Sequence, residues 1–168
     1  MVENVAVEVQ LALDNEFSAY VPDSEKIQQW ASAAVDVVFD FRKQEGTKRA
    51  QITVRVVEES EICQLNESFR HKVGATNVLS FPFLSPPGIP EDEVPGSLGD
   101  LVVCAAVVNS EASSQQKENI AHWAHMIVHG TLHLLGYDHQ NNEEASEMES
   151  LEKRVMLELG FLDPYAEI

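Results

Sequence analysis

Apolar and polar residues alternate in the first part of the chain. Residues 5–13 place a hydrophobic side chain at every second position, which predicts a half-buried strand whose apolar face is built from Val5, Val7, Val9, Leu11 and Leu13. The alternation returns over residues 50–58, and residues 77–83 and 98–104 are typical of two further strands. The pattern therefore predicts four short strands.

Apolar residues recur every three or four positions in the segments between these strands. Residues 23–44 predict an amphipathic helix that ends at Gly46, and residues 60–70 predict a short helix capped by Ser60.

Two more segments of helical periodicity follow the last strand. The first is predicted over residues 109–135, with Asn109 or Ser110 as its cap. The second is predicted over residues 143–159, with Gly160 at its C-terminal end.

The order of elements predicts the architecture. Strand, helix, strand, helix, two strands and two helices favour one α+β domain over residues 1–168, in which helices pack against a small mixed sheet. The stretch LSPPGIPEDEVPGS (84–97) contains four prolines and two glycines. We expect it to be a surface loop rather than a linker, because a strand pattern resumes directly after it.

The composition fits a single globular domain in a reducing compartment. The 168 residues are 44% hydrophobic, enough to fill a core without disulfides. Cys63 and Cys104 lie far apart in the sequence and belong to no C-x-x-C pair, so we expect free, buried thiols. The N-terminus does not resemble a signal peptide, and no run of about 18 apolar residues is present. We therefore expect a cytoplasmic protein with no membrane association.

The charge balance is strongly acidic, with 11 Lys plus Arg against 28 Asp plus Glu. Such a surface lacks long-range attraction for a phosphate backbone, so any nucleic-acid role must use a local patch.

The segment HGTLHLLGYDH (129–139) carries three histidines. His129 and His133 are four residues apart, one turn along the same face of a helix, so their rings can point at one position. His139 lies six residues further on, about 240° round a continuous helix, and could not join them. Gly136 solves this problem, because a glycine in the left-handed conformation ends a helix and lets the chain bend back.

Three histidines without a fourth protein ligand predict a catalytic rather than a structural zinc ion. Water would occupy the open position, and the 2+ charge would lower its pKa to about 7, so that a metal-bound water becomes the candidate nucleophile. Imidazole also suits Ni²⁺ and other transition metals.

The spacing also matches the histidine skeleton of metzincin proteases. Those enzymes carry a glutamate general base directly after the first histidine, where this chain has Gly130. A peptidase is therefore disfavoured. His122 and His125 share the helix face; one alternative places His125 in the lining of the site, but the favoured interpretation puts both outside the metal site. Asp138 either orients a ligand or helps to form the turn.

Arg70, His71 and Lys72 form one of the few basic groupings in the chain. An arginine at a helix end suits a bidentate grip on phosphate, and an ordinary solvated charge is the alternative.

Five segments together resemble the bacterial YbeY family of metal-dependent endoribonucleases that mature ribosomal RNA: LNESFR, TNVLSFPF, LGDLVVC, AHWAHMIVHGTLHLLGYDH and EMESLE. The resemblance implies a zincin-like α+β fold and cleavage of single-stranded RNA at the 3′ end of small-subunit ribosomal RNA, with a role in ribosome quality control. It implies small-subunit ribosomal proteins and the GTPase Era as partners.

The resemblance also implies roles for particular residues. His129, His133 and His139 correspond to the family's zinc ligands, and Arg70 corresponds to its catalytic arginine. Val73 and Asn77 depart from the family's pattern, since many members have aspartate at these positions.

The residues and the resemblance lead to one mechanism as a hypothesis. The metal polarises a phosphodiester oxygen or supplies hydroxide, and Arg70 stabilises the charge that builds on the phosphorane. Gly130 leaves the general base unassigned; metal-bound hydroxide and the substrate's 2′-hydroxyl are both candidate nucleophiles, and His125 and Asp100 are candidates to assist.

Two other functions stay open at this point. One is a non-catalytic ribosome-assembly factor with a structural zinc ion, which the missing base favours. The other is a metzincin-like metallohydrolase or peptidase, which the histidine spacing favours and Gly130 opposes.

Overall fold

The structure is a computed structural model, and it describes residues 4–43, 49–84, 87–89 and 96–166. Its four-stranded sheet has the order β1-β2-β4-β3. Strand β1 pairs in parallel with β2, β2 pairs in parallel with β4, and β3 is an antiparallel edge strand. The strands are β1 (Asn4–Ala12), β2 (Arg49–Val57), β3 (Val78–Pro82) and β4 (Ser97–Cys104).

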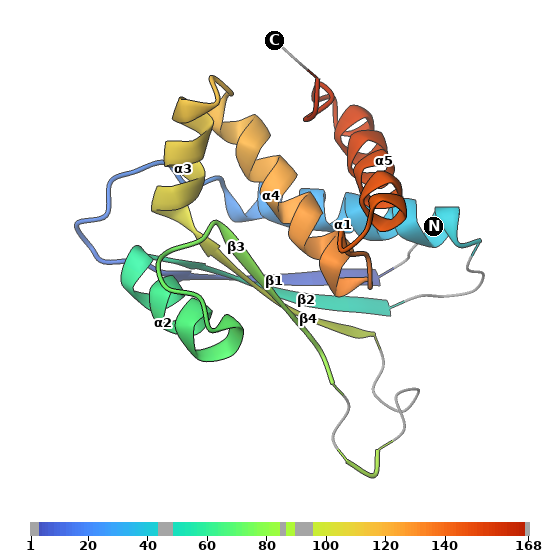
Figure 1. Cartoon of the computed structure of the whole chain (residues 1–168), viewed down its shortest axis with the longest axis horizontal. Coiled ribbons are helices and arrows are strands. Elements are labelled where there is room, and N and C mark those ends of the chain that lie inside the picture. Colours follow the sequence, from blue (N-terminus) through green and yellow to red (C-terminus); the bar gives the residue numbers. More distant parts are fainter. Residues whose placement is uncertain (1–3, 44–48, 85–86, 90–95, 167–168) are drawn as a thin grey trace.

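Helices cover both faces of the sheet (Figure 1). The helices α1 (Ser24–Phe41) and α4 (Asn119–Leu134) lie on one face, and α5 (Asn142–Glu158) packs on both of them. Helix α2 (Glu59–Arg70) lies on the opposite face, and α3 (Ala105–Ser114) follows directly from β4 and packs against α4.

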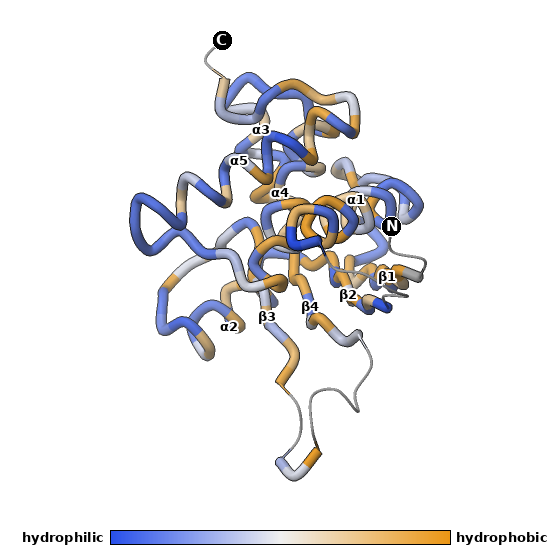
Figure 2. The backbone as a smooth tube through the Cα atoms, turned by 90° about the vertical axis from the view of Figure 1, so that its right-hand side faces the viewer, coloured by the Kyte–Doolittle hydropathy of each residue, from blue (hydrophilic) through white to orange (hydrophobic). Residues whose placement is uncertain are grey.

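The alternating strand pattern decides how the core is divided between the two faces. Ile52, Val54 and Val56 point into the large core shared with α1 and α4, whereas Val57 and Ile62 belong to a smaller cluster under α2. Each fully buried side chain of this kind stabilises the fold by about 1.5–3 kcal/mol. Figure 2 shows that hydrophobic residues are concentrated where α1, α4 and the sheet meet. The predicted single α+β domain with a small mixed sheet is therefore confirmed.

The prediction of one helix over residues 109–135 is wrong. The segment contains α3 and α4, separated at residues 115–118, where Gln116 adopts a left-handed φ of 56°. The sequence QQKE at this break has no glycine or proline, so local propensity does not reveal it. The break lets α4 cross back over the sheet.

The polar residues predicted as caps have other roles. Asn109 lies inside α3, where its side-chain oxygen accepts a hydrogen bond from the indole of buried Trp123 at 2.7 Å. Ser60 lies inside the first turn of α2, and the N-cap position is Glu58, whose side chain makes no capping hydrogen bond. That turn needs no serine cap to favour its start, because Glu59 and Glu61 complement the positive end of the helix dipole.

Gly160 follows α5 with a φ of 89°, as expected for a glycine at a helix C-terminus. Gly46 lies outside the described residues. Cys63 and Cys104 are free thiols; Cys104 is buried and Cys63 is half-buried. Among the described helices, none has the length and hydrophobicity needed to cross a membrane.

Candidate functional site

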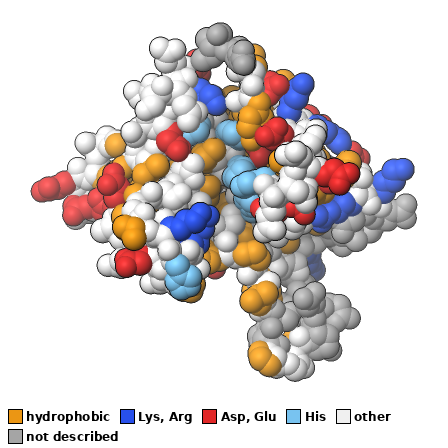
Figure 3. All heavy atoms as spheres, in the orientation of Figure 1, with side chains coloured by type: hydrophobic (Ala, Val, Ile, Leu, Met, Phe, Trp, Pro, Cys, Tyr) orange, Lys and Arg blue, Asp and Glu red, His pale blue; other side chains and the backbone are white. Residues whose placement is uncertain are grey.

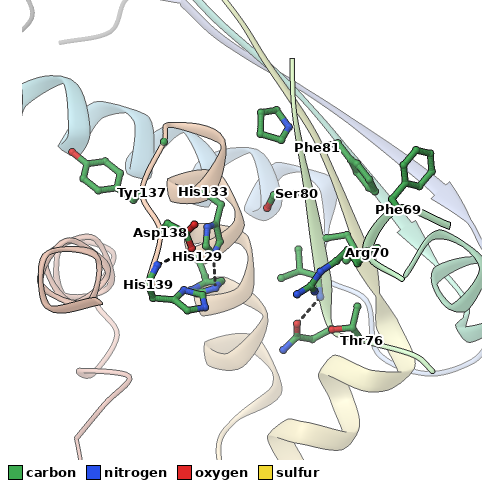
Figure 4. A pocket seen from close by; sticks show the side chains of 15 residues that line it. Phe69, Arg70, Thr76, Ser80, Phe81, His129, His133, Tyr137, Asp138 and His139 are labelled. Atoms are coloured by element: carbon green, nitrogen blue, oxygen red, sulfur yellow. Dashed lines mark hydrogen bonds between the residues drawn. The ribbon is translucent and has the colours of Figure 1, made fainter. Parts of the chain in front are cut away.

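A pocket of about 670 Å³ lies beside the edge strand β3, between the end of α2 and the end of α4 (Figure 4). It brings together residues that are up to 70 positions apart in the sequence, among them Phe69, Arg70, Ser80, Phe81, His129, His133, Tyr137 and His139. Histidine side chains gather in a hollow on the same face of the molecule (Figure 3).

The three predicted histidines converge at this pocket. His129 and His133 occupy successive turns of α4, and their Nε2 atoms are 3.1 Å apart. The ring of His139 lies 5.8 Å from that of His129 and 5.2 Å from that of His133, measured between centroids. One nitrogen from each ring falls within 4.8 Å of the other two, so the three side chains could hold a metal ion.

The turn after α4 is responsible for placing His139. Gly136 has a φ of 99°, and the N–H of Tyr137 donates to the carbonyl of Leu132, which closes the helix end. The side chain of Asp138 accepts a hydrogen bond from the N–H of His139 at 2.7 Å. The predicted glycine turn is thus present, and Asp138 helps to form it.

A buried carboxylate lies behind His129. Glu152 on α5 is 1% exposed, and it accepts hydrogen bonds from His125 Nε2, from His129 Nδ1 at 2.9 Å and from the Tyr165 hydroxyl at 2.6 Å. Burial alone would raise the pKa of Glu152, but the hydrogen bonds from His125 and His129 lower this pKa to about 2. The carboxylate is therefore ionised and holds the Nδ1 proton of His129.

This hydrogen bond settles which nitrogen of His129 is available. With Nδ1 donating to Glu152, the Nε2 atom faces His133 and the pocket with its lone pair. Burial lowers the pKa of His133, and the neighbouring His129 and His139 lower it further, so that ring also favours its neutral form. Imidazoles whose ring nitrogens converge in this way are the donor set that suits zinc and nickel.

A second set of side chains, His125, His129 and Glu152, also has ligand atoms close enough to hold an ion. Both His125 and Glu152 are buried, and the hydrogen bonds from the two histidines already satisfy the carboxylate. The set that contains His133 and His139 opens onto the pocket instead. The exposed set therefore fits a catalytic metal better.

Arg70 reaches the same pocket from a different element. It is the last residue of α2, and the chain turns sharply after it because His71 adopts a left-handed φ of 56°. In Figure 4 the guanidinium of Arg70 extends from α2 into the pocket, across from the histidines.

Gly130 has a packing role that explains why no general base stands there. A Cβ at this position would lie 2.9 Å from a methyl group of Leu101 and 3.3 Å from one of Val78. The Ser80 hydroxyl also donates to the carbonyl of Gly130 at 3.1 Å. Position 130 thus faces the sheet rather than the pocket.

The other predicted residues differ in how they lie relative to the three histidines. Asp100 lines a different pocket on the sheet, so it is no longer a candidate to assist the reaction. His125 lies next to His129, with ring centroids 6.2 Å apart, but it is buried and donates to Glu152 rather than lining the pocket. His122 is buried and donates to Glu111 at 3.0 Å. Of the two departures from the family pattern, Val73 is 93% exposed, whereas Asn77 lines the histidine pocket and donates to Glu111.

Sequence reasoning missed Glu152. The sequence of α5 did contain a signal for it. Buried positions recur every three or four residues along this helix, and all of them except Glu152 are apolar: Met148, Leu151, Val155 and Met156. A glutamate at a core position of this repeat needs a buried partner.

The fold and the site define a class of protein, an α+β domain with three convergent histidines facing an arginine across one pocket. A family model described as "Endoribonuclease YbeY" matches residues 12–160. The chain therefore belongs to the YbeY family of endoribonucleases, hydrolases that act in ribosomal RNA maturation.

The fold also has a counterpart among solved structures. The solution structure of TM1509 from Thermotoga maritima matches with a TM-score of 0.53 and 22% sequence identity, over 96% of this chain and 99% of that chain. At this level of identity the match supports the fold alone.

His122 predicts how stability depends on pH. Burial lowers its pKa below 6.5, although the Glu111 hydrogen bond acts in the opposite direction. As the pH drops below about 6.5, His122 binds a proton in the unfolded chain while it stays neutral in the folded protein. The free energy of unfolding should therefore fall as the pH drops below that value. Denaturant unfolding in the presence of a chelator, between about pH 7.5 and pH 5.5, measures this slope.

In His122→Gln the free energy of unfolding should fall less over this pH range than it does in the parent. His71→Gln, which changes an exposed histidine, should show the same fall as the parent. An equal slope in His122→Gln and the parent would contradict this interpretation.

Proposed function

We propose that the chain is a zinc-dependent endoribonuclease that cleaves single-stranded RNA at the 3′ end of small-subunit ribosomal RNA, both in maturation and in ribosome quality control. The observation that carries the proposal is the single pocket in which His129, His133 and His139 face Arg70, in a member of the YbeY family.

The three histidines are proposed as the protein ligands of one zinc ion, with nickel as an alternative metal. When bound, such an ion would polarise a phosphodiester oxygen and lower the pKa of a water molecule, which supplies a nucleophile near neutral pH. Glu152 fixes the ring of His129 so that its Nε2 atom points into the pocket. The turn at Gly136 brings His139 to the same position.

Arg70 is proposed to bind the scissile phosphate. Its planar guanidinium can donate two parallel hydrogen bonds to phosphate oxygens and stabilise negative charge as it builds on phosphorus. Among the ion pairs of the described residues, none includes Arg70, so its charge is available to a substrate. The substrate's own 2′-hydroxyl remains a second candidate nucleophile.

The charge of −17 argues against tight, indiscriminate binding of RNA. We propose that substrate choice relies on the assembling ribosome in the cytoplasm, with small-subunit ribosomal proteins and the GTPase Era as partners. These partners would supply the positive or shape-specific contacts that the acidic surface lacks.

One assay separates this function from its two rivals. The protein is incubated with single-stranded RNA, duplex RNA and a peptide library, each with and without a chelator. Cleavage of single-stranded RNA alone, abolished by the chelator, is the expected result. Peptide cleavage would instead support a metallohydrolase, and no cleavage of any substrate would support an assembly factor with structural zinc.

Removing a histidine ligand should weaken metal binding more than removing the carboxylate that orients His129. His133→Ala should purify without stoichiometric metal, and Glu152→Gln should bind zinc about 10- to 100-fold more weakly, because a neutral amide holds the Nδ1 proton of His129 less firmly. Elemental analysis and chelator competition measure these effects. Glu149→Gln, an exposed change on the same helix, is the control and should bind zinc as the parent does. Unchanged metal content in His133→Ala would refute the ligand assignment.

The two glycines that end α4 and α5 provide a matched pair. Gly136 and Gly160 have φ values of 99° and 89°, and no atom lies within 4 Å of a Cβ built on either. Alanine at each position should therefore cost about 1–2 kcal/mol of stability through backbone strain alone. Only Gly136→Ala should also weaken zinc binding, because only that turn carries a proposed ligand. Equal zinc affinity in the two variants would contradict the role of the Gly136 turn.

Arg70→Ala should keep its zinc and its fold yet cleave RNA on the order of 100-fold more slowly, as expected on loss of a preorganised electrostatic donor. Arg70→Lys should rescue poorly, since a point charge does not reproduce the planar guanidinium. Cleavage rates of zinc-loaded protein test this, with Arg49→Ala, a change of an exposed arginine on β2, as the control. A parental rate in Arg70→Ala would remove Arg70 from the site.

A further inference from the structure

Phe69 is a large aromatic residue that the fold leaves mostly in solvent beside the pocket. Its side chain is 65% exposed, although it lies on the same face of α2 as buried Ile62 and Asn66. The inward face of the helix therefore extends to Phe69, but the fold leaves this apolar side chain mostly uncovered. Burying this ring on folding would have been favourable, so its exposure at the rim of the candidate pocket indicates that it contacts a ligand.

The ring of Phe69 is held in place from one side. It packs against Phe81 of β3 in an edge-to-face arrangement, with centroids 5.4 Å apart and ring planes at 76°. In Figure 4 the two rings stand together at the end of the pocket that lies across from the histidines. A single edge-to-face contact covers at most one face of the Phe69 ring, so the ring can still offer an open face to a planar partner.

The charge next to Phe69 identifies that partner as anionic. Arg70, His71 and Lys72 follow it directly in the sequence, in a chain whose net charge is −17. The positive charges of Arg70 and Lys72 complement the negative end of the α2 dipole, but helix capping alone would not require an exposed aromatic ring beside it. An aromatic face next to cationic side chains is the combination that binds single-stranded nucleic acid, where bases stack and phosphates pair with arginine.

We infer that Phe69, supported by Phe81, stacks on the nucleobase adjacent to the phosphate that Arg70 binds, and so selects an unpaired nucleotide at the site. Residues 69 and 70 are neighbours, as are the base and the phosphate of one nucleotide. A base within a duplex is already stacked on both sides and cannot offer its face to the ring. The inference rests on the proposed function of the pocket and adds to it the group that discriminates against paired RNA.

Binding measurements test the ring separately from cleavage. Fluorescence anisotropy on zinc-loaded protein, with a short single-stranded oligonucleotide that carries a 2′-deoxy nucleotide at the scissile position and stays intact on a gel during the measurement, should show about 10-fold or more weaker binding for Phe69→Ala. Phe69→Tyr should restore most of the affinity, because a phenol ring also stacks. The slope of affinity against salt should be the same in Phe69→Ala and the parent, but shallower in Arg70→Ala, because only the arginine neutralises phosphate.

A cycle with abasic oligonucleotides tests the contact itself. In the parent, removing one base next to the bound phosphate should weaken binding by about the same factor as Phe69→Ala does. In Phe69→Ala, removing the same base should weaken binding little further. Phe41→Ala, which changes another exposed phenylalanine that lies outside the pocket, should bind as the parent does, and melting curves confirm that each variant is folded.

The outcomes separate the two hypotheses. If the parent binds single strands and Phe69→Ala binds them equally well, or if the base and the ring contribute independently, the stacking inference is wrong while the nuclease proposal stands. A loss that Phe69→Tyr does not restore also overturns the inference, since it assigns the ring a packing role. If the parent cleaves no RNA but the ring and base still couple, the nuclease proposal fails and the stacking site remains.

Discussion

The geometry of the site depends on the buried carboxylate of Glu152. Taking an unpaired carboxylate out of water would cost several kcal/mol, and here three hydrogen bonds, from His125, His129 and Tyr165, offset that cost. The donors come from α4 and from the segment after α5, so the carboxylate on α5 joins three parts of the chain. The same contact fixes the ring of His129, so the orientation of this candidate metal ligand is a consequence of packing.

The close approach of α4 to the sheet is a second constraint, and it explains where the pocket lies. Gly130 allows the helix to settle against Leu101 and Val78, which brings the histidines beside the edge strand β3. Because β3 is the edge of the sheet, helices from both faces can meet there. Helix α2 lies on the opposite face from α4 (Figure 1). Its last residues, Phe69 and Arg70, nevertheless line the same pocket as the histidines (Figure 4). The histidines and the candidate RNA-contacting residues thus come from opposite faces of the sheet.

Much of this arrangement could be predicted from local patterns. Alternation predicted the strands, and the four-residue spacing of His129 and His133 with the turn at Gly136 predicted the convergence of three histidines. These features depend only on residues close in sequence. The break between α3 and α4 could not be predicted in this way, since QQKE favours a helix and only tertiary packing interrupts it. Glu152 and Tyr165 were missed for a similar reason, because their role follows from a contact between α4, α5 and the C-terminal segment. Asp100 was wrongly considered a helper because the sequence does not reveal which surface of the sheet it occupies.

The central claim is that His129, His133 and His139, rather than the buried set of His125, His129 and Glu152, form the metal site. Anomalous diffraction at the zinc absorption edge, from crystals of protein purified with its own metal, tests this most directly. The account predicts one peak at the pocket, about 2.0–2.1 Å from a nitrogen of each of the three histidines. A peak bonded to the carboxylate of Glu152, or no peak near His133 and His139 in zinc-loaded crystals, would contradict it.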